Sequence, residues 1–148
     1  MAVKIEDWAK LVPELVVRDL SLSLAFWCDT IGFSVAYDRP EEKFAYLNLN
    51  GAQIMLEQYN EQEREWETAK LETPFGRGIN FQIEVENMDA IVDRLAQSNW
   101  PLFIPMEVRW YAADDVEFGQ RQFLVKDPDG YLLRLIEDLG ERPLVKEI

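Results

Sequence analysis

The sequence predicts an α+β fold built from two tandem βαβββ modules. In each half of the chain, one strand-like segment and one helix-like segment precede three strand-like segments. The two halves also close with similar hairpins, AYLNLNGAQIMLE and QFLVKDPDGYLLRLIE, as expected for an internal repeat. No linker-like composition separates them. We therefore expect a single domain over 1–148, with module one at about 10–59, a loop at about 60–77, module two at about 78–138 and a C-terminal tail at 139–148.

Module one opens with LVPELVV at 11–17, an apolar run that predicts a buried strand. Apolar residues then recur at helical spacing over 20–31. Asp19 or Ser21 is the candidate N-cap of this helix, and Gly32 is its candidate stop. Three segments rich in β-forming residues follow, with the sequences FSVAYD, KFAYLNL and AQIMLEQY.

The charged segment at 60–77 has neither helical nor strand periodicity, so we expect a long loop with at most one helical turn. Module two repeats the plan. A strand INFQIEV and a helix with Asn87 as candidate N-cap precede the strands PLFIPMEVRWY, FGQRQFLVK and YLLRLIE. The DPDG turn at 127–130 reverses the chain, and we predict no other role for it.

The formal net charge is −13, from 15 Lys and Arg against 28 Asp and Glu. This balance excludes a nucleic-acid partner, which needs a basic surface. The acidic surface either serves solubility or favours cationic ligands. The chain has no histidine, which excludes catalytic triads and imidazole metal sites. A metal site made of carboxylates alone stays open.

Cys28 is the single cysteine, so no internal disulfide forms. It lies within the first helical pattern, and we interpret it as a buried small hydrophobe because no histidine is present to activate it. No run of 18 apolar residues occurs, and the N-terminus lacks the apolar region of a signal peptide. We therefore expect a cytoplasmic protein with no membrane partner.

Two stretches, ELVVRDLSLSLAFWCDTIGF and FGQRQFLVKDPDGYLLRLIE, resemble the glyoxalase / bleomycin-resistance / extradiol-dioxygenase (vicinal-oxygen-chelate) superfamily, over roughly residues 10 to 138. The resemblance implies that each module forms a curved half-barrel sheet with an open cleft, where ligands bind. Enzymes of this superfamily hold a divalent metal on up to four cleft-facing side chains, usually histidine and glutamate.

Carried over to this chain, the metal positions fall on four residues: Val12, Met55, Asn80 and Arg134. Val12 and Met55 offer no hard donor, and Arg134 brings a positive charge where the cation would lie. One asparagine does not hold Mg²⁺, Mn²⁺ or Zn²⁺ by itself. We therefore predict no bound metal, no cofactor and no enzymatic activity. Arg134 would pair with Glu57 or Glu14, or would meet an anionic group of a ligand.

The metal-free branch that the chain most resembles is the bleomycin-resistance proteins. These proteins sequester a cationic drug in two grooves between the subunits of a homodimer. Together with strand alternation, the resemblance gives the candidate ligand-binding residues: Phe44, Tyr46, Glu57, Tyr59, Trp66, Trp110, Asp115 and Phe118. Among them, Phe44 and Phe118 fall where the resistance proteins carry aromatic residues. Asp115, with Asp114 and Glu117, would make the rim beside Phe118 acidic.

Each candidate has a structural alternative. Phe44 and Tyr46 would fill the cleft or a dimer seam, Phe118 would pack as an ordinary strand residue, and Trp66 would anchor the loop. For Trp110 the two interpretations are balanced. Two further tryptophans are expected to have structural roles only: Trp8, which would pin the N-terminal segment, and Trp100.

The function predicted from these observations is sequestration of a small cationic, planar ligand of the bleomycin type by a homodimer. Two alternatives remain open. The chain would bind another small molecule on the same scaffold, or it would be an atypical enzyme of the superfamily in which a carboxylate such as Glu14, Glu57 or Glu84 acts as a base. A stoichiometric metal in purified protein would favour the enzyme.

Overall fold

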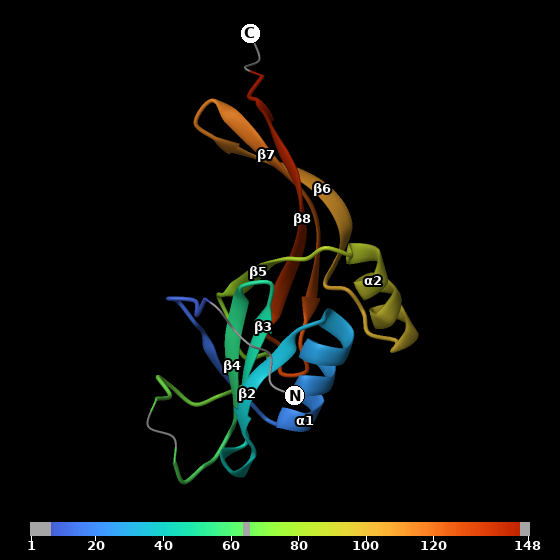
Figure 1. Cartoon of the computed structure of the whole chain (residues 1–148). Helices are drawn as coiled ribbons and strands as arrows, with labels where there is room; N and C mark the ends of the chain where they lie inside the picture. Colours follow the sequence, from blue (N-terminus) through green and yellow to red (C-terminus); the bar gives the residue numbers. More distant parts are fainter. Residues whose placement is uncertain (1–6, 64–65, 146–148) are drawn as a thin grey trace. The chain divides into compact units, whose positions relative to one another are not determined.

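The computed structural model describes residues 7–63 and 66–145, which belong to two compact units (Figure 1). The units comprise the following ranges: 1–77 with 127–131 in unit 1, and 78–126 with 132–148 in unit 2. Each unit holds one open four-stranded sheet of mixed direction and one helical segment before its later strands. The predicted α+β class with two tandem βαβββ modules is therefore confirmed. That the whole chain acts as a single domain stays a prediction.

The sheet of unit 1 has the order β1-β4-β3-β2, with β1 parallel to β4 and the other neighbours antiparallel. Its strands are β1 (Glu14–Val17), β2 (Ser34–Arg39), β3 (Phe44–Leu49) and β4 (Ala52–Gln58), with a short 3₁₀ turn, η2 (Pro40–Glu42), before β3. The first strand begins at Glu14 and not at residue 11 as predicted. Pro13, which has no N–H to donate to a ladder, lies directly before it.

The helical segment of unit 1 begins as α1 (Leu20–Leu24) and continues as a π-helix, η1 (Ala25–Ile31). Asp19 is the N-cap, since its carboxylate accepts the N–H of Leu22 at 3.2 Å. Gly32, with a φ of +116°, ends the segment as predicted and donates its N–H to the carbonyl of Trp27. The Trp27 side chain is fully buried and anchors this segment in the core.

Unit 2 repeats the topology with the order β5-β8-β7-β6, and β5 runs parallel to β8. Its elements are β5 (Asn80–Glu84), α2 (Met88–Gln97), β6 (Ile104–Ala113), β7 (Val116–Lys126) and β8 (Leu132–Pro143). The predicted N-cap of α2 is confirmed, because the side chain of Asn87 accepts the N–H of Ala90 at 3.1 Å. The helix buries Met88, Ile91 and Leu95 on one face.

The last two strands of unit 2 are longer than predicted, with 11 and 12 residues in β7 and β8. β8 pairs with β7 as far as Pro143, which lies opposite Val116, and Figure 1 shows these strands running on past α2. The predicted tail at 139–148 is therefore wrong for residues 139–143, because these residues continue the antiparallel ladder. Residues 146–148 lie outside the described part of the chain.

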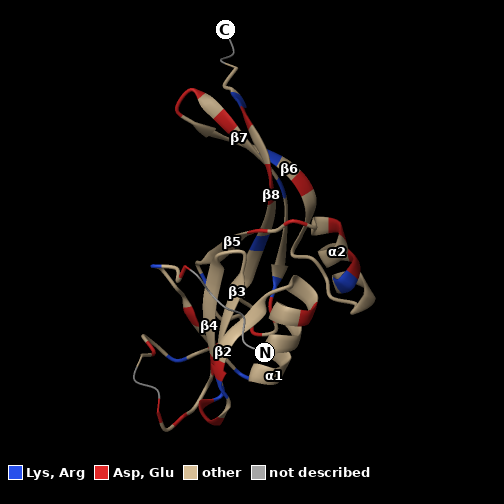
Figure 2. Ribbon diagram, in the orientation of Figure 1, with Lys and Arg blue, Asp and Glu red and all other residues tan. Residues whose placement is uncertain are grey.

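Acidic residues are spread along the chain in both units, as the colouring in Figure 2 shows. They include exposed residues of the segment between β4 and β5, such as Glu61 and Glu72, and of the turn between β6 and β7. Within the described residues, no helix is long and apolar enough to cross a membrane.

Candidate ligand-binding site

The unit 1 sheet buries side chains on both of its faces. Ala45 and Leu47 are fully buried on the face that was predicted to pack under the helix. On the opposite face, Phe44 and Tyr46 are only 2% and 5% exposed. They form a cluster with three smaller or more flexible side chains: Ala36, Val12 and Met55. Alternation was therefore predicted correctly for β3, but the two candidate stacking rings are covered by other side chains.

Two aromatic residues outside the predicted set provide much of this cover. Tyr37 is stacked on Tyr46, with ring centroids 5.1 Å apart and planes 19° apart. Trp8 meets both tyrosines edge-on, at 5.9 Å from Tyr37 and 5.0 Å from Tyr46. These geometries are the favourable arrangements of aromatic pairs. We call Trp8, Tyr37, Phe44 and Tyr46 the aromatic cluster.

Gln53 holds the N-terminal segment against the aromatic cluster. Its side-chain oxygen accepts the N–H of Ala9 at 2.8 Å and the hydroxyl of Tyr46 at 2.6 Å, while its amide nitrogen donates to the carbonyl of Asp7 at 3.0 Å. Gln53 is itself buried. Burial, with the neighbouring Tyr37, raises the pKa of Tyr46, so its hydroxyl stays a donor. Trp8, between Asp7 and Ala9, is thereby fixed over the tyrosines.

The outer ring face of Phe44 carries a cation from the protein itself. The guanidinium of Arg39 lies 3.8 Å from the ring centroid of Phe44, and its Nε donates to Glu42 at 2.6 Å. Glu57 lies opposite Phe44 in the ladder between β3 and β4, so both side chains are on the same face of the sheet. The structure thus brings together Phe44, Tyr46 and Glu57 from the predicted set.

Two other predicted residues of unit 1 lie outside this cluster. Tyr59 follows β4, donates its N–H to the carbonyl of Val17, and has 42% of its surface exposed. Trp66 is 77% exposed in the segment between the sheets. The loop-anchor alternative for Trp66 stays a prediction.

The three predicted residues of unit 2 lie at the β6–β7 hairpin but do not share one surface. Trp110 is opposite Gly119 in the ladder, and its ring covers this glycine. Phe118, the neighbour of Gly119, therefore points to the other face of the sheet, where it is 43% exposed. Asp115 lies exposed in the hairpin turn.

Salt bridges alter the predicted acidic rim at this hairpin. Arg142 lies 3.8 Å over the ring of Trp110 and donates to Glu117 at 2.8 Å. Glu117 is therefore paired, whereas Asp114 and Asp115 are exposed in the turn. A cationic group near Phe118 would meet these two aspartates and also Glu141, which lies exposed opposite Phe118 in the ladder between β7 and β8.

The residues at the family's metal positions do not fit a metal. Val12 and Met55 pack against the aromatic cluster of unit 1. In unit 2, Asn80 is exposed, and Arg134 donates to the side-chain oxygen of Gln82 at 2.8 Å. No group of three or more His, Cys, Asp or Glu residues within 7–63 and 66–145 is arranged to hold a metal ion. The expected pairing of Arg134 with Glu57 or Glu14 stays a prediction.

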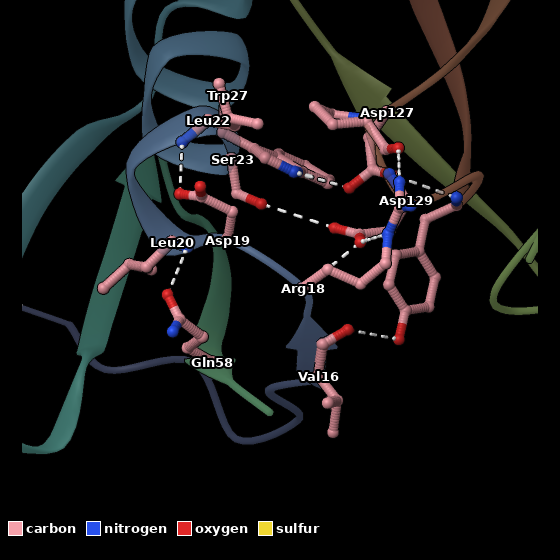
Figure 3. A network of polar contacts seen from close by, with 12 residues as sticks. Val16, Arg18, Asp19, Leu20, Leu22, Ser23, Trp27, Gln58, Asp127 and Asp129 are labelled. Atoms are coloured by element: carbon pink, nitrogen blue, oxygen red, sulfur yellow. Dashed lines mark hydrogen bonds and ion pairs between the residues drawn. The ribbon is translucent and has the colours of Figure 1, made fainter. Parts of the chain in front are cut away.

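The DPDG turn does more than reverse the chain, contrary to the sequence prediction (Figure 3). Asp129 is 2% exposed and accepts hydrogen bonds from the N–H and the Nε of Arg18, at 3.0 and 2.8 Å, and from the hydroxyl of Ser23. Asp127 accepts the indole N–H of Trp27 at 3.1 Å. The two aspartates thus connect this turn to β1 and to the helical segment of unit 1.

Burial raises the pKa of Asp127 to about 6, although hydrogen bonds from Trp27 and from the N–H groups of Tyr131 and Asp129 act in the opposite direction. Beside this network lies a surface pocket of about 240 Å³, lined by Arg18, Asp19, Leu22, Pro128 and Asp129. The guanidinium of Arg18 is already bonded to Asp129 and to the carbonyl of Pro128. The network is therefore structural.

Cys28 is unsuited to nucleophilic chemistry. Its side chain is partly buried, and burial, with the nearby Asp29, raises the pKa of the thiol to about 11. The reactive thiolate is therefore scarce at neutral pH.

Open four-stranded sheets in two tandem βαβββ units define the structural class of this protein. Residues 9–135 match the family described as the Glyoxalase/Bleomycin resistance protein/Dioxygenase superfamily, and the chain belongs to it.

Two relatives with the same printed name illustrate the similarity in sequence. The chain is 27% identical over 141 residues to proteins named Bleomycin resistance protein from Geobacillus stearothermophilus and Staphylococcus aureus, covering 86% of this chain and 96% of each relative.

Solved structures support the fold. A protein of unknown function from Agrobacterium tumefaciens str. C58 is 25% identical, covers 91% of this chain and 98% of its own, and superimposes with a TM-score of 0.66. TioX from Micromonospora sp. ML1 is 19% identical, with 89% and 100% coverage and a TM-score of 0.63.

Proposed function

We propose that this protein is a metal-free binding protein that sequesters a cationic planar antibiotic of the bleomycin type, in grooves at a homodimer interface. The observation that carries the proposal is the replacement of all four metal positions of the family by Val12, Met55, Asn80 and Arg134. Without metal-binding side chains at these positions, the sheet faces can contact a small molecule directly. The bleomycin-resistance names of the relatives support the ligand class.

Three features of the chain fit a cationic planar ligand. Exposed aromatic rings, of which Phe118 is one, offer surfaces for stacking. Asp114 and Asp115 lie exposed near that ring, in the β6–β7 turn. The net charge of −13 attracts cations to the protein as a whole. Of the other predicted residues, Glu57, Tyr59, Trp66 and Trp110 are proposed to contribute further contacts, whereas Phe44 and Tyr46 lie buried beneath other side chains.

The direct test is isothermal titration of chelator-treated protein with metal-free and Cu²⁺-loaded bleomycin. We expect a dissociation constant of roughly 1 µM or tighter with about one drug per subunit. Affinity should fall with added salt, because the attraction is between opposite charges. Absence of binding at tens of micromolar drug, on the order of −6 kcal/mol or weaker, would remove the bleomycin proposal.

Two measurements on the same sample separate the alternatives. Metal analysis of protein purified without chelator is expected to find no stoichiometric metal, and a full equivalent would favour an atypical enzyme. Sedimentation equilibrium is expected to give a dimer. A monomer at the concentrations used for titration would contradict grooves formed between subunits.

A further inference from the structure

We propose that Trp8 and Tyr37 form the surface of unit 1 that contacts the ligand, and that this surface selects planar aromatic cations. The inference rests on the proposed function and deepens it, because it identifies contact residues that the sequence did not suggest. Trp8 is 54% exposed and Tyr37 is 37% exposed. Phe44 and Tyr46, beneath them, are almost fully buried. Trp8 and Tyr37 therefore present ring surface to solvent, whereas Phe44 and Tyr46 do not.

The two exposed rings form a corner. Their planes meet at 69°, with centroids 5.9 Å apart. Tyr37 lies nearly parallel to Tyr46, so Tyr46 occupies one face of the Tyr37 ring. A flat ligand that stacks on the other face of Tyr37 would lie beside the indole of Trp8. Contact with two rings at a steep angle favours a planar ligand over a rounded one.

The corner is fixed before any ligand arrives. Gln53 bonds the backbone on both sides of Trp8, at Asp7 and Ala9. Tyr37 is fixed by its stack on Tyr46, whose hydroxyl also bonds to Gln53. A surface that is ordered in the free protein loses little conformational entropy on binding.

The preference for a cation follows from the groups around the corner. Arg39 places a planar guanidinium on the ring of Phe44, so the aromatic cluster already accepts a flat cation on one of its rings. The charge of Arg39 is compensated by Glu42 at 2.6 Å. Asp7 is exposed next to Trp8, and Glu57 shares the sheet face with Phe44. Lys10 is also exposed, two residues after Trp8, so Asp7, Lys10, Arg39, Glu42 and Glu57 together carry a formal net charge of −1.

The test is a fluorescence and calorimetric titration with proflavine, a planar aromatic cation, on the full chain. We expect Trp8→Ala and Tyr37→Ala each to weaken proflavine binding roughly tenfold, and Trp8→Phe to restore most of the affinity. Phe103→Ala is the matched control. Phe103 is also an exposed aromatic, at 53%, but it lies in unit 2 outside the proposed site. It should leave the affinity unchanged.

Ligand class is tested with two further probes. Anthracene-9-carboxylate, a planar anion, and tetrapropylammonium, a rounded cation, should both bind more weakly than proflavine. Thermal melts of the variants confirm folding, and Trp8→Phe retains the ring that covers Tyr46.

The outcomes separate this inference from the proposed function. Proflavine binding that depends on Trp8 and Tyr37, without any binding of bleomycin, would support the corner and remove the bleomycin proposal. A second outcome is that both alanine variants bind bleomycin as tightly as wild type, while proflavine binding is also unchanged or absent. This outcome would contradict the role of Trp8 and Tyr37 as ligand contacts and would leave the proposed function standing. If neither probe binds the wild-type protein, both proposals fail.

Discussion

The two units share one topology but use their second sheet face differently. In unit 1 that face carries the aromatic cluster, and the segment at Trp8 covers it. In unit 2 the corresponding face carries polar groups, with Arg134 bonded to Gln82 and with Gln122 bonded to Glu107 at 3.0 Å. The last three strands are also longer in unit 2, with 10, 11 and 12 residues against 6, 6 and 7.

This difference shows which face of a βαβββ unit is constrained. The face that packs under the helix needs apolar side chains, and both units meet this need with fully buried residues: Leu47 and Leu56 in unit 1, and Phe123, Leu133 and Leu135 in unit 2. The opposite face closes no helix–sheet core, so its composition is less constrained. In unit 1 it carries aromatic rings, and in unit 2 it carries hydrogen-bonding groups beside the buried Leu124 and Ile136.

The largest expected effect concerns the two aromatic residues that the sequence treated as equivalent. Phe44→Ala should lower the free energy of unfolding by about 4 kcal/mol, because it opens a cavity in a closed cluster. Phe118→Ala should cost about 0.5 kcal/mol, because much of the ring already contacts water. Urea unfolding followed by circular dichroism measures both.

Equal losses of stability in the two variants would contradict this contrast between a covered face and an open one. The measured stabilities also decide how a loss of ligand binding in each variant is interpreted. A loss of binding in Phe118→Ala reports on ligand contact, whereas a loss in Phe44→Ala would also report on damage to the fold.

The second prediction concerns how the free energy of unfolding depends on pH. The expected dependence has opposite signs for one carboxyl group in unit 1 and one in unit 2. Burial raises the pKa of Asp127 in unit 1 to about 6, above its unfolded value. Its contribution to stability is therefore complete below about pH 4 and is lost as pH rises through about 6, a change of roughly 3 kcal/mol. Asp127→Asn should remove this dependence, so the stability difference between wild type and variant should narrow as pH rises from 4 to 7.

Asp89 of unit 2 supplies the matched control. Hydrogen bonding and charge from Arg121 lower the pKa of Asp89, so its smaller contribution is present at neutral pH and is lost as pH falls. Urea unfolding of Asp127→Asn and Asp89→Asn at four pH values tests both signs. If the free energy of unfolding changed equally with pH in wild type and Asp127→Asn, the Asp127 carboxyl would not be the cause of the pH dependence.

Features set by residues close together in the sequence could be predicted, whereas contacts between residues far apart in the sequence could not. Strand and helix periods, the Asp19 cap and the Gly32 stop are local signals, and the structure has all of them. Alternation along β3 correctly placed Phe44 with Tyr46 on one face. The cover over that face was not predictable, because the bond between Ala9 and Gln53 joins residues 44 positions apart.

The DPDG turn illustrates the same limit. Its four residues specify a turn locally, and nothing in them indicates a partner. The bonds of Asp129 to Arg18 span 111 positions.

The smallest effect tests how Trp110 is held in unit 2. A Cβ at Gly119 would lie 2.6 Å from the Trp110 ring, so Gly119→Ala should push the indole out from under Arg142 and cost about 1 kcal/mol. In a Trp110→Ala background the same substitution meets no ring and should be neutral or slightly stabilising. A double-mutant cycle by urea unfolding measures the coupling.

An equal cost in both backgrounds would mean that the backbone at Gly119, and not the ring, resists a side chain. A coupling near 1 kcal/mol would instead establish that Trp110 is held by contacts within its own hairpin. The two units would then hold their tryptophans in different ways. In unit 1 the tryptophan of the aromatic cluster, Trp8, is supplied by a distant N-terminal segment. In unit 2 the glycine and the arginine that fix Trp110 come from the two strands that follow it.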